Sequence, residues 1–263
     1  MVNMTLLDDL LVGLPDGEVV EACIGLHWTA VVVNGPAGQR CGLASTLASE
    51  GYHHTSEPDV PQAGQLEALS GREMAALARS DRPTLRSLGF AAINALLPPL
   101  PDAWTDGNAE AIIAERGAGK TVAMVGHFPF VERLKPRVGT LYVLEQNPQG
   151  DDLPADAAPD ILPEADVIAI TAMTLVNGTL ESLLPLCPSG ATTLLLGPST
   201  TLSPVLFDYG LDLISGAVVM AIEPVLRHIR QGANFRQVHR AGVRLVTMTA
   251  PDSHRRNPSS SAI

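Results

Sequence analysis

The chain of 263 residues is 46% hydrophobic but only 4% aromatic, so aliphatic side chains must fill its core. Its formal net charge of −11 argues against nucleic acid as a partner, because neutralising phosphates requires clustered Lys and Arg. With three widely spaced cysteines, no basic leader and no apolar run near the ~18 residues of a membrane span, we expect a cytoplasmic protein without disulfides or membrane contact.

The first part of the chain, residues 1–98, predicts a small α+β domain. A short helix is expected over 4–12, followed by β-rich runs at 18–24, 28–33 and 40–44. Turn residues between the second and third runs predict a hairpin, so the three runs should form an antiparallel meander.

Two helices are predicted after this meander, over 70–78 and 84–97. Ser70 and Glu73 have the spacing of a capping box, and Pro83 suits the first turn of a helix. The Pro-rich segment 98–101 then ends the domain, because repeated proline cannot continue a helix.

The pattern of residues 104–250 is an alternation of apolar strands and helices. Strands are expected near 121–126, 140–145, 166–171, 192–197, 212–216 and 243–248. Helices are expected at 107–116, 129–135, 178–187, 203–209 and 220–231. Such alternation predicts a Rossmann-like α/β domain, with a mostly parallel sheet and helices on both faces. The Ser/Pro-rich residues 251–263 are expected to be disordered.

Gly117-Ala-Gly-Lys-Thr121 resembles the end of a phosphate-binding P-loop, but its context argues against one. A P-loop follows a strand and opens a helix, so that backbone N–H groups face the phosphate. Here a helix is predicted before the motif and a strand after it. Lys120 is therefore expected to be a solvated residue at the other edge of the sheet.

Gly126 and Glu145 carry the strongest functional signal. Each ends a predicted buried strand, and they lie 19 residues apart, close to the roughly 20 between the first turn and the ribose-binding acid of a Rossmann unit. The loop has one glycine rather than Gly-x-Gly-x-x-Gly, which disfavours a dinucleotide. A plain tight turn at Gly126 and a solvated strand end at Glu145 are the alternatives.

The other candidate ligand-binding residues follow the same strand ends, because parallel strands meet at one crevice. They are Gly126, His127, Phe128, Glu145, Asn147, Thr171, Asn177, Thr179, Gly197, Pro198, Ser199 and Thr200. His127 and Glu145 are the catalytic candidates, and His127 could equally donate a hydrogen bond or bind a metal. Ser, Thr and Asn at these positions could instead be helix caps.

No metal ligands are assigned. Cys23, His27 and Cys41 lack a Cys-x-x-Cys pair. The best cluster for a metal is His53-His54 with Glu50, Glu57 and Asp59, and the alternative for this run is a solvated loop. A Ser–His–Asp triad can be written from Ser199, His127 and Asp151, but it lacks the Gly-x-Ser-x-Gly turn.

Several motifs together resemble the family named "putative heavy-metal chelation domain". They are Val125-Gly-His-Phe-Pro-Phe130, Glu145-Gln-Asn-Pro148, Asn177-Gly-Thr-Leu-Glu181, Leu196-Gly-Pro-Ser-Thr200 and, near the N-terminus, Ile24-Gly-Leu-His-Trp-Thr29 with Cys41-Gly-Leu-Ala44. The resemblance implies an enolase-N-terminal-like α+β domain, a Rossmann-like domain and a cleft between them. It implies no specific reaction.

The function that we expect is an enzyme acting on a small polar or nucleoside-like molecule in that cleft. The ligand could be S-adenosylmethionine or the precursor of a chelator, and a transferase or lyase reaction suits a nucleoside-containing substrate. A non-catalytic binder of a metal or metal chelate is the alternative. A homodimer is allowed but not required.

Overall fold

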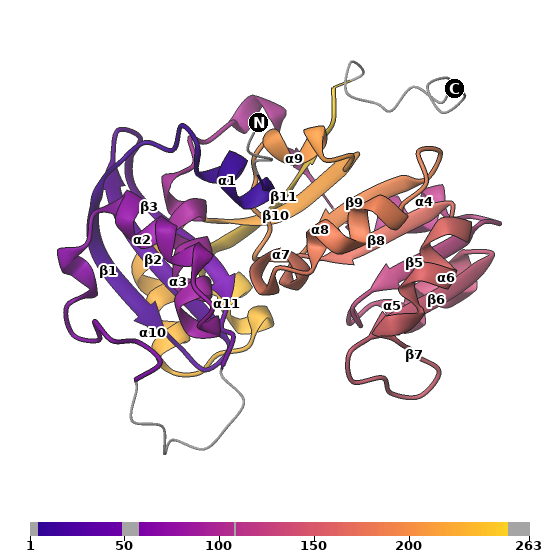
Figure 1. Cartoon of the computed structure of the whole chain (residues 1–263), viewed down its shortest axis with the longest axis horizontal. Coiled ribbons are helices and arrows are strands. Elements are labelled where there is room, and N and C mark those ends of the chain that lie inside the picture. Colours follow the sequence, from indigo (N-terminus) through magenta and orange to yellow (C-terminus); the bar gives the residue numbers. More distant parts are fainter. Residues whose placement is uncertain (1–4, 49–57, 108, 252–263) are drawn as a thin grey trace. The chain divides into compact units, whose positions relative to one another are not determined.

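The computed structural model describes residues 5–48, 58–107 and 109–251, whose contacts form two compact units (Figure 1). Unit 1 comprises Met1–Asp102, Pro198–Ser203 and Gly216–Leu245, and unit 2 comprises Ala103–Gly197, Pro204–Ser215 and Val246–Ile263. The predicted division into 1–98 and 104–250 stays a prediction. The contacts group two later segments of the chain, 198–203 and 216–245, with the N-terminal residues.

Unit 1 contains a three-stranded antiparallel sheet in the order β1-β2-β3, which confirms the predicted meander. The strands are β1 (Glu18–Ile24), β2 (Trp28–Gly35) and β3 (Gly38–Ser45). Gly35 pairs with Gly38, so Pro36 and Ala37 form the predicted tight connection. Gly38 has a φ of +80°, a conformation that glycine adopts without strain.

The helices of unit 1 come from both ends of the chain. They are α1 (Leu6–Leu11), α2 (Gly71–Ala76), α3 (Pro83–Leu96), α10 (Ile222–Arg230) and α11 (Phe235–Gly242). Ser70 and Glu73 form the predicted capping box at the start of α2, and Pro83 lies in the first turn of α3. α11 had no predicted counterpart, although Asn234 and Gln237 form a capping box before it.

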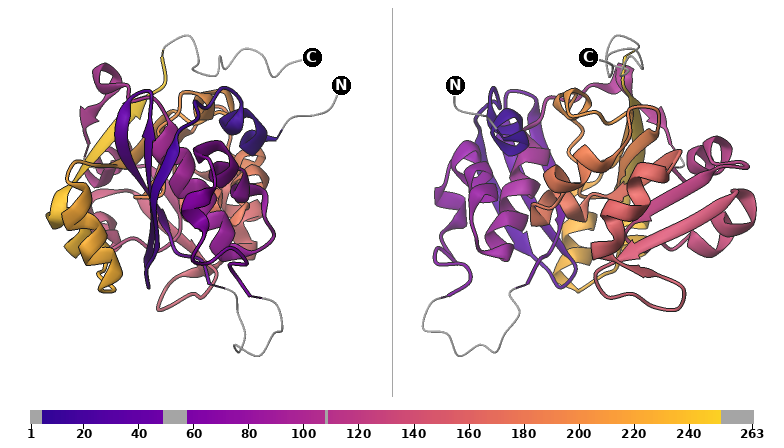
Figure 2. Two further views of the ribbon diagram at one scale, coloured as in Figure 1. Left: turned by 90° about the vertical axis from the view of Figure 1, so that its left-hand side faces the viewer. Right: turned by 45° about the vertical axis from the view of Figure 1, so that its right-hand side comes forward.

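Helices cover both faces of the small sheet (Figure 2, left). On one face, Gly42 lies so close to α3 that a Cβ there would be 2.0 Å from the Ala91 carbonyl oxygen. On the other face, Cys41 and Leu43 pack in one core with Val225 and Leu226 of α10. Burial on both faces explains why six successive residues of β2, 28–33, are buried.

An eight-stranded sheet has the strand order β4-β11-β10-β9-β8-β5-β6-β7, and most of its residues belong to unit 2. The strands are β4 (Thr105–Asp106), β5 (Thr121–Val125), β6 (Thr140–Glu145), β7 (Leu153–Pro154), β8 (Val167–Thr171), β9 (Thr192–Leu196), β10 (Leu213–Val219) and β11 (Val243–Thr249). From β10 to β7 all pairs are parallel, whereas β11 pairs antiparallel with the short β4. The predicted mostly parallel sheet is confirmed.

The strand order places a topological switch point between β5 and β8. The spatial order of five parallel strands is β6-β5-β8-β9-β10. Numbered by their sequence along the chain, these strands read 2-1-3-4-5, a doubly wound arrangement in which the first and third strands are neighbours. The connections leaving these two strands go to opposite sides, which opens a crevice at their carboxyl ends. The sheet therefore directs a ligand to the ends of β5 and β8.

Helices of unit 2 pack on this sheet in short segments. They are α4 (Ala109–Arg116), α5 (Val131–Leu134), α6 (Ala158–Ile161), α7 (Met173–Asn177), α8 (Leu180–Leu183) and α9 (Val205–Asp208). Ile113 of α4 and Leu134 of α5 share one core with Val122 and Met124 of β5. No helix in the described part of the chain is long and apolar enough to cross a bilayer.

The order of elements around Lys120 is the one predicted from the sequence. α4 ends at Arg116 before the Gly-rich segment, β5 begins at Thr121 after it, and Lys120 is exposed. The segment therefore does not open a helix, as a P-loop must.

Candidate functional site

A pocket of about 510 Å³ lies in unit 2 at the carboxyl ends of β5, β6 and β8. Its volume falls within the range of small-molecule sites, roughly 300–1,000 Å³. Val125 and Leu144 contribute apolar surface, as do Met173 at the start of α7 and Leu183 at the end of α8. The pocket lies at the switch point, where doubly wound sheets bind their ligands.

Gly126 ends β5 with a φ of +102°, in the region that favours glycine. Its N–H donates to the Leu144 carbonyl of β6, and a Cβ at this position would lie 2.9 Å from Thr171 Cγ2. The glycine is therefore required by the close approach of β5 to the end of β8, whether or not a ligand is bound.

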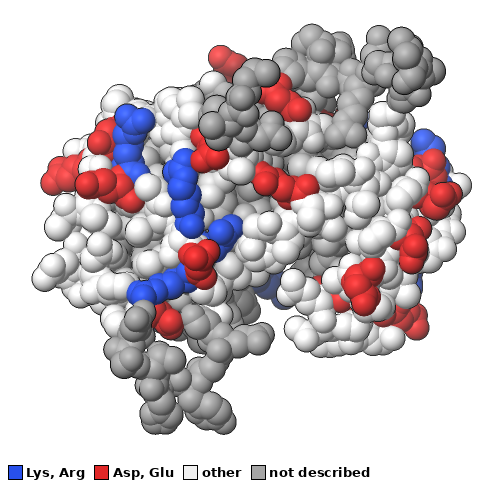
Figure 3. Space-filling view, viewed as in Figure 1, with Lys and Arg blue, Asp and Glu red and all other residues white. Residues whose placement is uncertain are grey.

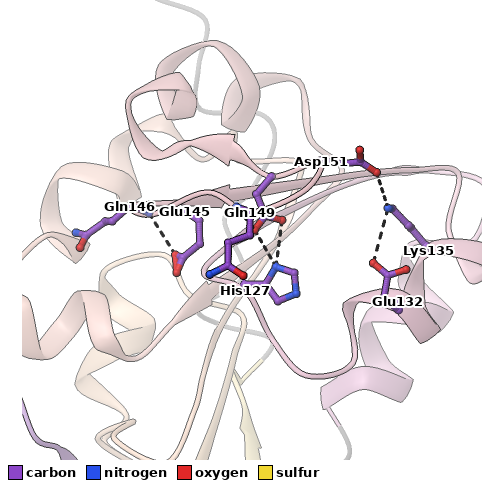
Figure 4. Close-up of polar contacts among 8 residues, drawn as sticks. His127, Glu132, Lys135, Glu145, Gln146, Gln149 and Asp151 are labelled. Atoms are coloured by element: carbon purple, nitrogen blue, oxygen red, sulfur yellow. Dashed lines mark hydrogen bonds and ion pairs between the residues drawn. The ribbon is translucent and has the colours of Figure 1, made fainter.

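Two acids give the pocket its negative character. Glu145 is half-buried at the end of β6, where Oε2 accepts a hydrogen bond of 3.2 Å from the Gln146 N–H, and Asp156 is the second acid in the lining. Among the described residues that line the pocket, none is Lys or Arg. The nearby Lys135 donates to Asp151 at 3.0 Å, and this bond, with the charge of Glu132, raises the pKa of Lys135 (Figure 4).

His127 is held in place by a carboxylate. Its Nδ1 lies 2.9 and 3.0 Å from the two oxygens of Asp152, whose side chain is only 6% exposed, whereas the His127 side chain is 44% exposed. Asp152 also accepts from the Gln149 N–H at 3.2 Å. The structure thus pairs His127 with Asp152, rather than with the Asp151 considered in the sequence.

The polar groups that follow β8 are partly used by the chain itself. Thr174 donates to the Thr171 carbonyl at 2.7 Å, and Asn177 Oδ1 accepts from both the N–H and the hydroxyl of Thr179. These bonds shape the turn between α7 and α8, in which Gly178 adopts a left-handed conformation. Asn177 also lines the pocket.

The structure brings seven of the predicted ligand-binding residues to the lining of one pocket. They are Gly126, His127, Phe128, Glu145, Thr171, Asn177 and Thr179. Asn147, Gly197, Pro198, Ser199 and Thr200 are not among the residues that line it. Ligand contact at all twelve positions stays a prediction.

Two family models match the chain, one over residues 7–97 and one over residues 108–248, and both are described as "putative heavy-metal chelation". The chain belongs to this family. An uncharacterized protein of Methanocaldococcus jannaschii is 28% identical over 222 residues, which cover 82% of this chain and 84% of that protein.

Two crystal structures of family members with unknown function are similar to this fold. The protein from Desulfitobacterium hafniense is 29% identical, with a TM-score of 0.74 over 93% of this chain and 96% of its own. The protein from Pyrococcus horikoshii is 26% identical, with a TM-score of 0.75 over 94% of this chain and 100% of its own.

In this family member, Ser199 is bound to the small sheet of unit 1. Its hydroxyl oxygen accepts from the Ser45 N–H at 2.8 Å and lies 3.0 Å from the Ser45 hydroxyl, while its carbonyl accepts from Asn94 at 3.3 Å. The neighbouring Thr200 hydroxyl is buried without a hydrogen-bond partner in the described part of the chain. These contacts give Ser199 a structural role that needs no ligand.

The family description directs attention to possible metal ligands. Cys23 and Cys41 are buried in the core between the small sheet and α10. Burial raises the pKa of both thiols, that of Cys41 to about 12, so neither is readily available as the thiolate that binds metals. Within 5–48, 58–107 and 109–251 no three His, Cys, Asp or Glu side chains are arranged to hold a metal ion, and His53 and His54 lie outside these residues.

Several residues of the site were not predicted from the sequence. Met173, Asp156 and Ser182 line the pocket, and Asp152 does not line it but contacts His127 from a loop. The pair Asp151-Asp152 was visible in the sequence, but no spacing rule distinguishes the acid that faces His127 from the one that faces Lys135.

Proposed function

We propose that this protein is an enzyme whose switch-point pocket binds a nucleoside without a phosphate chain, with S-adenosylmethionine as the first candidate. The observation that carries the proposal is the placement of Glu145 beside the Gly126 turn, in a pocket of about 510 Å³ with an acidic lining. The single-glycine turn and the strand-end carboxylate suit a nucleoside better than a dinucleotide.

The lining supplies groups for each part of such a ligand. Glu145 can accept hydrogen bonds from the two ribose hydroxyls, as the equivalent acid does in Rossmann units. Leu144 and Leu183 offer apolar surface to the base, and Asp156 offers a negative charge to a sulfonium or ammonium group. The tail of S-adenosylmethionine carries both of these cations.

Charge argues against ATP and NAD at the same pocket. Phosphates are bound by Lys or Arg together with the free N–H groups of a helix start. Neither Lys nor Arg lines the pocket in the described residues, and α5, after the Gly126 turn, has only four residues. The acids Glu145 and Asp156 would repel a polyphosphate.

Titration calorimetry with S-adenosylmethionine, S-adenosylhomocysteine, adenosine, ATP and NAD tests the proposal. We expect the first three ligands to bind, and Glu145→Gln to weaken binding at least tenfold. Glu115→Gln is the matched control, because Glu115 is exposed on α4 and does not line the pocket. No binding of the first three ligands, or equal affinity for ATP, would overturn the proposal.

Elemental analysis of the same purified sample addresses the metal-binding alternative. The described residues supply no set of three metal ligands, and the measurement covers the whole protein. Retention of a stoichiometric metal in protein that binds no nucleoside would favour the alternative instead.

A further inference from the structure

The His127–Asp152 pair fixes the protonation pattern of the imidazole. Asp152 is a carboxylate that accepts hydrogen bonds, so the nitrogen facing it at 2.9 Å, Nδ1, must carry the proton. In the neutral ring Nε2 then carries a free lone pair, which is the form of histidine that accepts a proton. The same arrangement orients the general base in Ser–His–Asp enzymes.

The pair is positioned by two anchored segments. His127 directly follows Gly126 at the end of β5, and Asp152 belongs to the loop after β6. Asp152 is held within that loop by the Gln149 N–H, which donates to Oδ2 at 3.2 Å. Because Asp152 is almost fully buried, its orientation of the ring is protected from competing water.

His127 lines the pocket beside an aromatic side chain. Phe128, also in the lining, stacks on Phe130 with ring centroids 5.4 Å apart and an interplanar angle of 23°. A flat ring of a second substrate can stack on such a surface. The lining thus contains both an aromatic ring and an imidazole.

We propose that His127 is the general base of a methyl transfer to a phenolic hydroxyl, with Asp152 as its positioning residue. This inference rests on the proposed binding of S-adenosylmethionine. His127 Nε2 takes the phenolic proton, the phenolic oxygen forms a bond to the methyl carbon, and the carbon–sulfur bond breaks. The electron pair of that bond neutralises the sulfonium, and the imidazolium beside Asp152 later releases its proton to water.

A phenol is the acceptor class that suits this base. The pKa of a phenolic hydroxyl is about 10, several units lower than that of an aliphatic alcohol. An imidazole can therefore remove its proton as the new bond forms, which is the condition for effective general-base catalysis. The phenolic ring also matches the surface offered by Phe128.

The test measures S-adenosylhomocysteine formed from S-adenosylmethionine with catechol as the probe acceptor. We expect His127→Gln and Asp152→Asn each to lower kcat at least 100-fold, while the Kd for S-adenosylmethionine changes less than threefold. Asp151→Asn is the matched control, because it makes the same change at the adjacent, 89% exposed carboxylate. Added imidazole should partly restore turnover by His127→Gly.

The outcomes separate the two proposals. If S-adenosylmethionine does not bind the wild-type protein, the proposed function fails, and this inference fails with it. If it binds but catechol gives no S-adenosylhomocysteine, or if Asp152→Asn is no slower than Asp151→Asn, the general-base inference alone is overturned. His127→Gln changes an exposed side chain, so it keeps the test decisive even if Asp152→Asn does not fold.

Discussion

Gly126 and Thr171 hold the two strands of the switch point in close contact, since a Cβ on Gly126 would lie 2.9 Å from Thr171 Cγ2. One residue belongs to the turn after β5 and the other to the end of β8. The site can therefore form only where the chain carries no side chain at this turn.

Gly126→Ala should lower the free energy of unfolding more than Gly119→Ala. Both glycines have a positive φ, +102° and +71°, but an added Cβ meets nothing within 4 Å at Gly119. The steric contact should add about 1–3 kcal/mol, measured by urea denaturation. The close contact would be refuted by equal losses, and Thr171→Ala should relieve part of the effect in a double-mutant cycle.

Ser199→Ala should destabilise unit 1 without weakening ligand binding. The change removes the acceptor of the Ser45 N–H, and leaving a partly buried donor unpaired costs about 1–3 kcal/mol. Calorimetry with S-adenosylmethionine should give a Kd within twofold of wild type, in contrast to Glu145→Gln. A loss of affinity with unchanged stability would instead support Ser199 as a ligand contact.

Gly42→Ala should prevent unit 1 from folding normally. The new Cβ would lie 2.0 Å from the Ala91 carbonyl oxygen and 2.4 Å from the Ala95 nitrogen, both in the backbone of α3. Because backbone atoms cannot rotate away, we expect a loss of about 3 kcal/mol or more. Circular dichroism and solubility report this loss, and Gly190→Ala, in open space, should be neutral.

The stability of the protein should fall in alkaline solution partly because of Cys41. Burial raises the pKa of this thiol from 9.0 to about 12, so the folded state holds its proton where the unfolded state has lost it. The stabilising contribution is complete below pH 9 and is lost as the pH rises toward 12, by at most about 1.4 kcal/mol per pH unit. Urea denaturation between pH 8 and 10.5 should show a shallower decline for Cys41→Ala, and identical slopes would contradict this.

Much of the fold follows from local sequence. The apolar run of β5 and the turn residues before Gly38 are sufficient to predict a buried strand and a hairpin. α11 was not predicted, because its apolar stripe is short: Phe235, Val238 and Ala241 pack on the core and are separated by polar residues. The packing of α10 on the small sheet was not predictable either, since an apolar face does not specify its partner.

The charge of the surface also agrees with simple expectations from composition. On the face shown in Figure 3, basic side chains lie among acidic ones and form no broad patch. Composition predicts a surface on which acidic and basic side chains are mixed. It does not predict the acidic lining formed by Glu145 and Asp156, because that lining depends on which loop faces the pocket.

Site residues at the ends of strands were predicted from the sequence, whereas a site residue positioned by a loop was not. Gly126 and Glu145 follow from the ends of β5 and β6, and both line the pocket. Ser199 has the same sequence signature as a ligand-binding residue, yet its hydroxyl bonds to Ser45. The contact between Asp152 and His127 spans 25 residues and depends on the path of a loop, which no local pattern records.

The packing of α10 and α11 has a consequence for how this family can be divided. The two matched ranges, 7–97 and 108–248, suggest two separable modules, but Val225 and Val238 of the second range complete the core around Trp28 of the first. A fragment starting at residue 103 would expose these helices, and one ending at residue 102 would expose one face of its sheet. The two ranges should therefore be expressed together, because each needs apolar side chains of the other to cover its own.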